Sequence, residues 1–197
     1  PKPLMKVCNL PLVLLSVATL VACQPKQAGQ ETSDAEDMPP PTIVKPSVAA
    51  SSGFSEQFRK TTEAYMAVKD AFVKSDTAAV NRAADALMQA VAHTQTNGEA
   101  QQKWNQVKPM LMRTISGVRG MSELADKRAA FEDLSKIMYE AVNAFGASAT
   151  VYKQYCPMAF DDKGAYWLSL NAEIRNPYFG DEMLECGEVQ QVLTFEE

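Results

Sequence analysis

Between residues 54 and 146, apolar side chains recur every three or four positions, which is the period of an amphipathic α-helix. Turn and capping residues divide this region into four runs. The runs end at Ser75-Asp76, at Asn97-Gly98, at Gly117 with Gly120, and at Gly146. The third run, from about Glu99 to Ser116, contains Pro109, which predicts a kink or a later start. Four amphipathic helices with short links predict a mainly α fold, an antiparallel four-helix bundle. The residues expected to face inward are Phe58, Thr62, Tyr65, Val68, Phe72, Val80, Ala84, Leu87, Val91, Trp104, Val107, Leu111, Ile115, Leu124, Phe131, Leu134, Met138, Val142 and Phe145.

The pattern changes after Gly146. Residues 151–160 and 165–170 are rich in aromatic and β-branched side chains, and the turn signal Asp161-Asp162-Lys163-Gly164 joins them. This predicts a C-terminal hairpin. Asn176-Pro177 starts a further turn, and Asp181 is a candidate cap for one helical turn that ends at Gly187. On such a turn Met183 and Cys186, three residues apart, would share a face.

The N-terminal part predicts export. Residues 10–22 form an apolar run that is too short to cross a bilayer, which favours a signal sequence over a membrane span. The run ends at Leu20-Val21-Ala22-Cys23, which resembles a lipobox, so residues 1–23 are interpreted as a lipoprotein signal with lipidation at Cys23. The alternative is an ordinary secretory signal. Gln24 favours sorting to the outer membrane, and the expected location is its periplasmic face, with a lipid anchor.

Residues 24–53 hold few large apolar side chains, three consecutive prolines from Pro39 and an acidic run from Glu31 to Asp37. Such a composition cannot offset the entropy of ordering, so a flexible linker is expected. Residues 54–197 then form one domain, a helical bundle with a sulfur-rich C-terminal loop. The formal net charge of the chain is -5 at pH 7, which argues against a nucleic-acid partner.

Four sulfur-bearing residues lie in two turn-rich C-terminal segments. Cys156 and Met158 belong to the first, and Met183 and Cys186 to the second. Thiolate and thioether are soft ligands that select Cu(I), so these residues are candidate metal ligands. The alternative is a disulfide, which is usual for an even cysteine pair in an exported protein, with the methionines filling gaps in the core.

Catalytic signals are weak in this chain. No Gly-rich phosphate loop, HExxH helix or CxxC pair is present, and His93 is the single histidine. Its place near the end of the second predicted helix favours a capping or surface role over metal ligation. Zinc usually requires four nitrogen or sulfur ligands, and their typical spacing is missing. We therefore expect no enzyme.

The C-terminal residues carry a specific resemblance. The motifs are Tyr155-Cys156-Pro157-Met158-Ala159, then Gly164 to Ser169, then Glu173 to Asp181, and finally Met183 with Cys186-Gly187. Together with Arg128-Ala129-Ala130-Phe131 and Ser135, they resemble an exported bacterial domain of unknown function. That domain occurs alone and fused to periplasmic adaptor subunits of copper/silver efflux systems, and the resemblance spans roughly residues 61–192.

The resemblance implies a helical bundle linked to heavy-metal export. The expected function is that of a periplasmic lipoprotein that binds Cu(I) or Ag(I) as an accessory to metal efflux or tolerance, with an efflux adaptor or another envelope protein as partner. The alternative is a disulfide-stapled envelope interaction module without metal.

Overall fold

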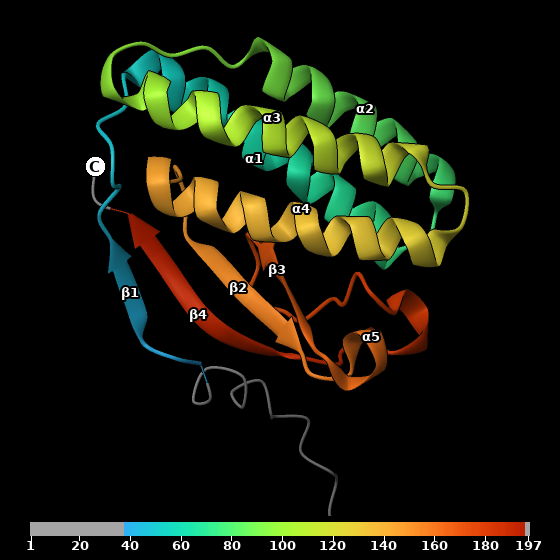
Figure 1. Ribbon diagram of the computed structural model, residues 1–197. Coiled ribbons are helices and arrows are strands. Elements are labelled where there is room, and N and C mark those ends of the chain that lie inside the picture. Colours follow the sequence, from blue (N-terminus) through green and yellow to red (C-terminus); the bar gives the residue numbers. More distant parts are fainter. Residues whose placement is uncertain (1–37, 196–197) are drawn as a thin grey trace, which may run out of the picture.

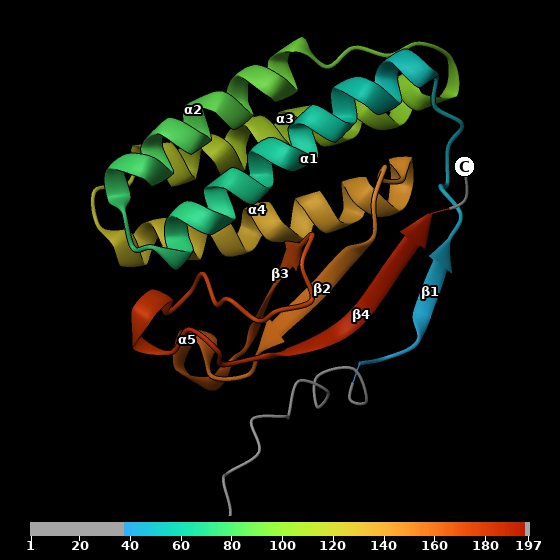
Figure 2. The same cartoon turned by 180° about the vertical axis from the view of Figure 1, so that it is seen from behind.

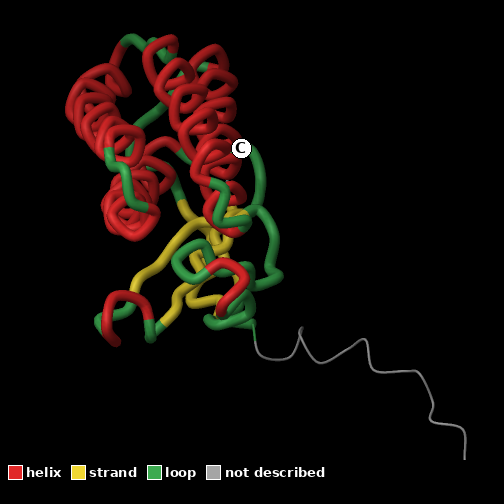
Figure 3. Tube along the Cα trace, turned by 90° about the vertical axis from the view of Figure 1, so that its right-hand side faces the viewer, coloured by secondary structure: helices red, strands yellow, loops and turns green. Residues whose placement is uncertain are grey.

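The computed structural model describes residues 38–195. Four long helices form one layer, and a small mixed sheet with its loops forms the other (Figures 1 and 3). The mainly helical fold and the C-terminal hairpin expected from the sequence are confirmed, whereas the antiparallel direction of the helices stays a prediction. In chain order the elements are β1 (Pro41–Val44), α1 (Ser52–Val73), α2 (Thr77–His93), α3 (Gly98–Gly120), α4 (Leu124–Phe145), β2 (Val151–Cys156), α5 (Ala159–Asp162), β3 (Ala165–Ser169), the 3-10 turn η1 (Gly180–Glu182) and β4 (Glu188–Phe195).

Local capping chemistry sets several helix ends. The side chain of Ser51 accepts a hydrogen bond from the backbone N–H of Phe54 at the start of α1, and Asp76 does the same for Ala79 at the start of α2. Gly146 ends α4 with a φ of 81°, a conformation that favours glycine. Gly117 does not break the chain as the sequence suggested. α3 continues through it to Gly120, and a Cβ at Gly117 would lie 3.5 Å from that of Ala130, which is an ordinary contact distance between α3 and α4.

Aromatic side chains fill the interior of the helical layer. At one end, the rings of Phe54, Phe58, Trp104 and Phe145 pack within about 6 Å of one another, mostly edge to face. Farther along, Phe131 of α4 packs against Tyr65 and Phe72 of α1. All of these side chains are buried, as the helical periodicity predicts. α4 lies next to the sheet and packs against β3, so it joins the two layers (Figures 1 and 2).

The sheet has the strand order β1-β4-β2-β3. β2 pairs antiparallel with β3 and with β4, whereas β1 pairs parallel with β4. Tyrosine hydroxyl groups satisfy backbone groups of β3: Tyr65 accepts from the N–H of Leu168, and Tyr178 donates to the carbonyl of Tyr166. Capping of backbone groups in this way reduces the tendency of an edge strand to pair with another chain.

Within residues 24–53, which the sequence predicts to be a flexible linker, the described part contains the strand β1. Residues 41–44 pair with Val192–Phe195 of β4, and α1 begins at Ser52. An edge strand needs only backbone hydrogen bonds on one side, so it forms without a buried apolar face. Ile43 accordingly remains 68% exposed. The signal sequence and the lipobox with Cys23 lie outside the described residues. Within residues 38–195, no helix is both long and apolar enough to cross a membrane.

A buried lysine connects three of the helices. The Nζ of Lys127 in α4 donates to the carbonyl oxygens of Val118 and Arg119 at the end of α3, and to the side-chain oxygen of Asn81 in α2. These carbonyls belong to the last turn of a helix, where they lack an intrahelical donor. Burial lowers the pKa of Lys127, and the nearby charge of Arg119 lowers it further.

We predict that Lys127→Met lowers the free energy of unfolding by about 1–3 kcal/mol, because the buried carbonyl oxygens lose their donor. Urea denaturation of the reduced protein measures this change. Lys60→Met is the matched control, since Lys60 lies on the solvent face of α1 with a 62% exposed side chain. Equal stability of the two variants would contradict the role assigned to Lys127.

Candidate metal centre

Two cysteine side chains meet at one end of the sheet. Cys156 is the last residue of β2, and Cys186 lies two residues before the start of β4. Both are free thiols, and their Sγ atoms lie 2.9 Å apart although 30 residues separate them in the chain. The prediction that these two cysteines lie within contact distance is therefore confirmed. Cys156 is fully buried, whereas Cys186 is partly exposed.

The register of the sheet explains this proximity. β2 and β4 are antiparallel, and Tyr155 lies opposite Glu188. The residues just beyond this pair, after β2 and before β4, therefore come together. Gly187 makes the approach possible. It has a φ of 144°, and a Cβ on it would lie 2.7 Å from the carbonyl oxygen of Tyr155 and 3.1 Å from the ring of Trp167. A larger residue at 187 would push Cys186 away from Cys156.

A buried amide holds the loop of residues 170–187 against the sheet. The Nε2 of Gln154 donates to the carbonyl oxygens of Asn171, Ala172 and Glu173, at 2.9 to 3.1 Å. Its Oε1 accepts from the indole N–H of Trp167 at 2.7 Å. Gln154 is fully buried, and this loop crosses β2 and β3 in Figure 2. Gln154 could not be recognised from the sequence, because one glutamine in a strand gives no signal of a buried role.

A second buried amide, that of Asn176, fixes the backbone of Cys186. The Nδ2 of Asn176 donates to the carbonyl oxygen of Cys186 at 2.8 Å. The backbone N–H of Asn176 donates to the carbonyl oxygen of Leu184. Its Oδ1 accepts from the backbone N–H groups of Tyr178 and Phe179. The sequence identified Asn176-Pro177 as a turn, and the structure adds that this asparagine ties the turn to the cysteine.

The two candidate methionine ligands differ in their surroundings. Met158 follows Cys156 by two residues and is 47% exposed, so it does not fill a gap in the core. Met183 is partly buried, and its carbonyl oxygen accepts from the N–H of Cys186. The helical turn expected from Asp181 to Gly187 is instead the shorter η1, and the side chain of Asp181 does not cap it. The shared helical face of Met183 and Cys186 is therefore not formed.

A left-handed turn follows Met158. Phe160, Asp161 and Asp162 have φ values of 55°, 57° and 62°, which cost non-glycine residues roughly 1–2 kcal/mol each. Two contacts hold this turn. The ring of Phe160 packs edge to face on Tyr178, and a Cβ on Gly164 would lie 1.8 Å from the hydroxyl oxygen of Tyr155. The predicted Asp161–Gly164 turn is thus present, and it brings the chain back from Met158 into β3.

Burial and mutual contact shape the acidity of the pair. The pKa of Cys186 rises to about 11, chiefly because of its hydrogen bond with Cys156, and then because of burial and the charge that Cys156 would carry. At neutral pH, Cys186 is therefore a neutral thiol. A bound metal would have to displace its proton, since the thiolate is the ligand form.

Harder ligands do not converge on the sulfur atoms. No group of three or more His, Cys, Asp or Glu side chains in residues 38–195 is arranged to hold a metal. His93 lies exposed at the end of α2, with its Nδ1 2.7 Å from the carbonyl oxygen of Gln89, as expected for a surface or capping role. Met158 and Met183 are the further candidate ligands that the sequence offers beside the cysteine pair.

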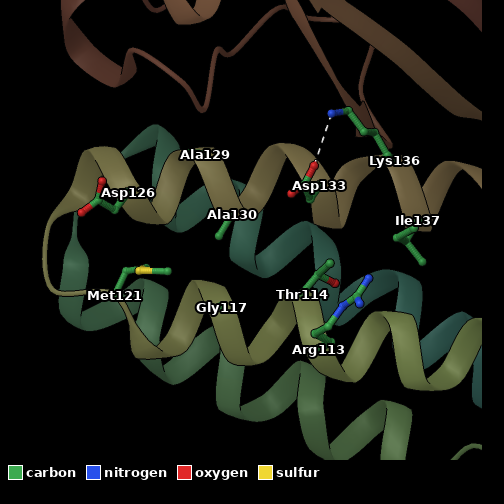
Figure 4. A pocket seen from close by; sticks show the side chains of 10 residues that line it. All are labelled: Arg113, Thr114, Gly117, Met121, Asp126, Ala129, Ala130, Asp133, Lys136 and Ile137. Atoms are coloured by element: carbon green, nitrogen blue, oxygen red, sulfur yellow. Dashed lines mark hydrogen bonds and ion pairs between the residues drawn. The ribbon is translucent and has the colours of Figure 1, made fainter.

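An open groove of about 800 Å³ lies between α3 and α4, away from the cysteines (Figure 4). Small residues at its centre, Gly117 and Ala130, leave this space. The groove carries charges of both signs and no cluster of polar groups aimed at a common point. Its lining consists of Arg113, Thr114, Gly117, Met121, Asp126, Ala129, Ala130, Asp133, Lys136 and Ile137.

Residues 61–150 match the family described as "Protein of unknown function (DUF3347)". The matched range begins within α1 and ends one residue before β2, so it covers most of the helical layer. These residues are therefore similar to a domain of unknown function, in the part of the chain where the resemblance placed one. No curated protein and no solved structure gives a significant match. The cysteine pair lies beyond the matched range.

We predict that the thiolate of Cys186 in the reduced protein forms only as the pH approaches about 11, against an ordinary value of 9.0. The folded state holds this proton more tightly than the unfolded state. Its contribution to stability is thus complete below pH 9 and is lost as the pH rises through 11. The alkylation rate of Cys186 as a function of pH, with the urea-unfolded chain as reference, measures the shift. Cys156→Ala should move the titration back toward 9, and an unshifted titration in wild type would contradict the assigned hydrogen bond.

Proposed function

We propose that this protein is a periplasmic lipoprotein that binds Cu(I), and Ag(I) by the same chemistry, as an accessory to heavy-metal efflux or tolerance. The observation that carries the proposal is the convergence of the Cys156 and Cys186 thiols from two separate segments. Met158 and Met183 complete the ligand set in this proposal. No catalytic activity is part of it.

The ligand chemistry favours a soft monovalent ion. Two thiolates with thioether neighbours suit Cu(I), whereas zinc sites usually require four nitrogen or sulfur ligands. Met158 supports this assignment because its side chain is 47% exposed two residues after the buried Cys156. A thioether that is not held by core packing is free to turn toward a metal at the cysteine pair.

Metal binding would require a small movement of the sulfur atoms. With the roughly 2.3 Å metal–sulfur distance of zinc sites, two thiolates on one ion lie about 3.8 Å apart in a tetrahedral arrangement, and farther apart in a linear one. The observed separation is 2.9 Å, so the pair must open by roughly 1 Å or more. Rotation of the partly exposed Cys186 side chain is the simplest way, since Cys156 is buried at the end of a strand.

The second candidate function is a disulfide-stapled module that binds an envelope protein and no metal. The 2.9 Å separation favours it, because only a further approach of the two sulfur atoms is needed to reach a bond length of about 2.05 Å. A disulfide closing a loop of this size would stabilise the domain by a few kcal/mol. It would also fix residues 170–187 as a rigid surface.

The proposed location follows from the lipobox-like sequence at Cys23. In this proposal residues 24–40 connect the lipid to β1, and they reach at most about 60 Å when fully extended. Met38 and Pro39 line a hollow together with Glu188, which lies two residues from Cys186. The chain therefore leaves the fold near the cysteine pair. A membrane-proximal position of the thiols would suit delivery of metal to an efflux adaptor.

We predict that the reduced protein binds one Cu(I) ion. Cys156→Ser or Cys186→Ser should weaken binding at least a hundredfold, and Met158→Leu about tenfold, because a thiolate is a stronger ligand than a thioether. Met121→Leu should leave the affinity unchanged, since Met121 is equally exposed (46%) but lies at the end of α3. Affinity should rise with pH, because the ligating thiols lose protons. Competition with a chromogenic Cu(I) chelator under anaerobic conditions measures each value.

Two results of this titration would reject copper binding. One is that reduced wild type fails to remove Cu(I) from a chelator of moderate affinity. The other is that the double serine variant binds as tightly as wild type. In either case the sulfur pair is structural, and the disulfide-stapled module becomes the function to retain.

We predict that Cys23→Ser abolishes membrane attachment, because it removes the proposed lipidation site. Incorporation of labelled palmitate and fractionation of the cell envelope test this. Cys8→Ser is the matched control and should leave both unchanged, since Cys8 lies within the predicted signal. If the Cys23→Ser protein incorporates as much labelled palmitate as wild type, Cys23 is not the lipidation site.

A further inference from the structure

We infer that the cysteine pair is a redox-gated site, in which Cys186 reacts first with a small-molecule disulfide and Cys156 then closes the intramolecular bond. In the reduced state the pair is open to a soft metal, and in the oxidised state it is closed. The inference rests on the proposed copper binding for the effect of the gate, and on the geometry of the two thiols for its chemistry.

The two thiols differ in access. Cys156 has no exposed surface, and it belongs to the hydrophobic core. Cys186 lies just before β4 and is partly exposed. A dissolved disulfide can therefore reach the sulfur of Cys186 and not that of Cys156. Access is a requirement for thiol–disulfide exchange, so the order of the two steps is set by burial.

The exchange is balanced without any further reactant. The thiolate of Cys186, formed by loss of a proton to solvent, attacks one sulfur of the small disulfide and releases the other half as a thiolate. Cys156, 2.9 Å away, then loses its proton and attacks the Sγ of Cys186, which releases the second half. The protein loses two electrons and two protons, and the small disulfide becomes two thiols.

Hydrogen bonds hold the backbone of Cys186 on both sides. Asn176 holds the carbonyl oxygen of Cys186, and the carbonyl of Met183 accepts its N–H, so the main chain at 186 is fixed on both sides. The sulfur separation then depends on side-chain rotation. It is about 2.05 Å in a disulfide, 2.9 Å in the free pair, and roughly 3.8 Å or more around a metal. A metal cannot bind between sulfur atoms that are bonded to each other.

The order of attack is tested on the full chain carrying Cys8→Ser and Cys23→Ser, so that only the two site cysteines remain. Glutathione disulfide is the oxidant, and mass spectrometry follows the products. With Cys156→Ser, a mixed disulfide should accumulate on Cys186. With Cys186→Ser, Cys156 should react at least tenfold more slowly. If Cys156 reacts as fast as Cys186, the assigned order is wrong. If the mixed disulfide accumulates in the protein with both thiols, Cys156 does not close the bond and the inference fails.

The gate itself is tested by Cu(I) titration of the same chain in three states: reduced, oxidised by glutathione disulfide, and reduced again. We expect the reduced chain to bind one ion, the oxidised chain to bind none, and the re-reduced chain to bind one again. Copper binding that persists after the 156–186 disulfide has formed would overturn the gate and leave the proposed function intact. Failure of the reduced chain to bind Cu(I) would overturn the proposed function and the gate with it. In that case, the exchange experiment still reports whether the pair forms a staple.

Discussion

The buried amide of Gln154 is the interaction on which the C-terminal half of the structure depends. It joins the strand β2 to Trp167 of β3 and to three consecutive carbonyl oxygens of the following loop. These carbonyls lie outside the strands, and the amide of Gln154, which is fully buried, would be costly to leave without partners. One side chain thus donates hydrogen bonds to the backbone carbonyls at the place where the chain leaves β3 and turns back across the sheet. The return of that chain brings Cys186 beside Cys156.

The helical layer supports this arrangement from the other side. Tyr65 and Ser135, from α1 and α4, form a buried hydrogen bond, and Tyr65 also accepts from the backbone of β3. Arg128 of α4 donates to the carbonyl oxygen of Pro177 and to Ser75 in the turn after α1. The loop that carries the second cysteine is therefore tied both to the sheet and to the helices. This explains how a thiol near the surface can be held within bonding distance of a buried one.

The match to a family of unknown function ends one residue before β2, whereas the two cysteines lie at the end of β2 and just before β4. The helical layer and the sulfur site are thus separate parts of the molecule. The helices provide a stable platform with a charged groove and no convergent chemical groups in the described residues. Cys156, Cys186 and the exposed Met158 provide the features from which a function is proposed.

The helical layer was predictable from the sequence because its signals are local. Period and capping residues gave four helices, with Ser75-Asp76, Asn97-Gly98 and Gly146 near their ends, and the Asp161–Gly164 turn gave the hairpin. Gly117 was misread as a helix end, because one glycine costs a helix only about 1 kcal/mol and α3 continues to Gly120. The strand β1 was missed because it forms by pairing with residues about 150 positions away.

The sequence by itself determined which sulfur-bearing residues are present and that they lie in two turn-rich segments. Only the tertiary structure decided that the two thiols meet, that one is buried and the other partly exposed, and that Met158 lies outside the core. These properties depend on strand register and on the buried amides of Gln154 and Asn176, which are contacts between residues distant in the chain. Composition and periodicity report only on the near neighbours of a residue, so they cannot supply such contacts.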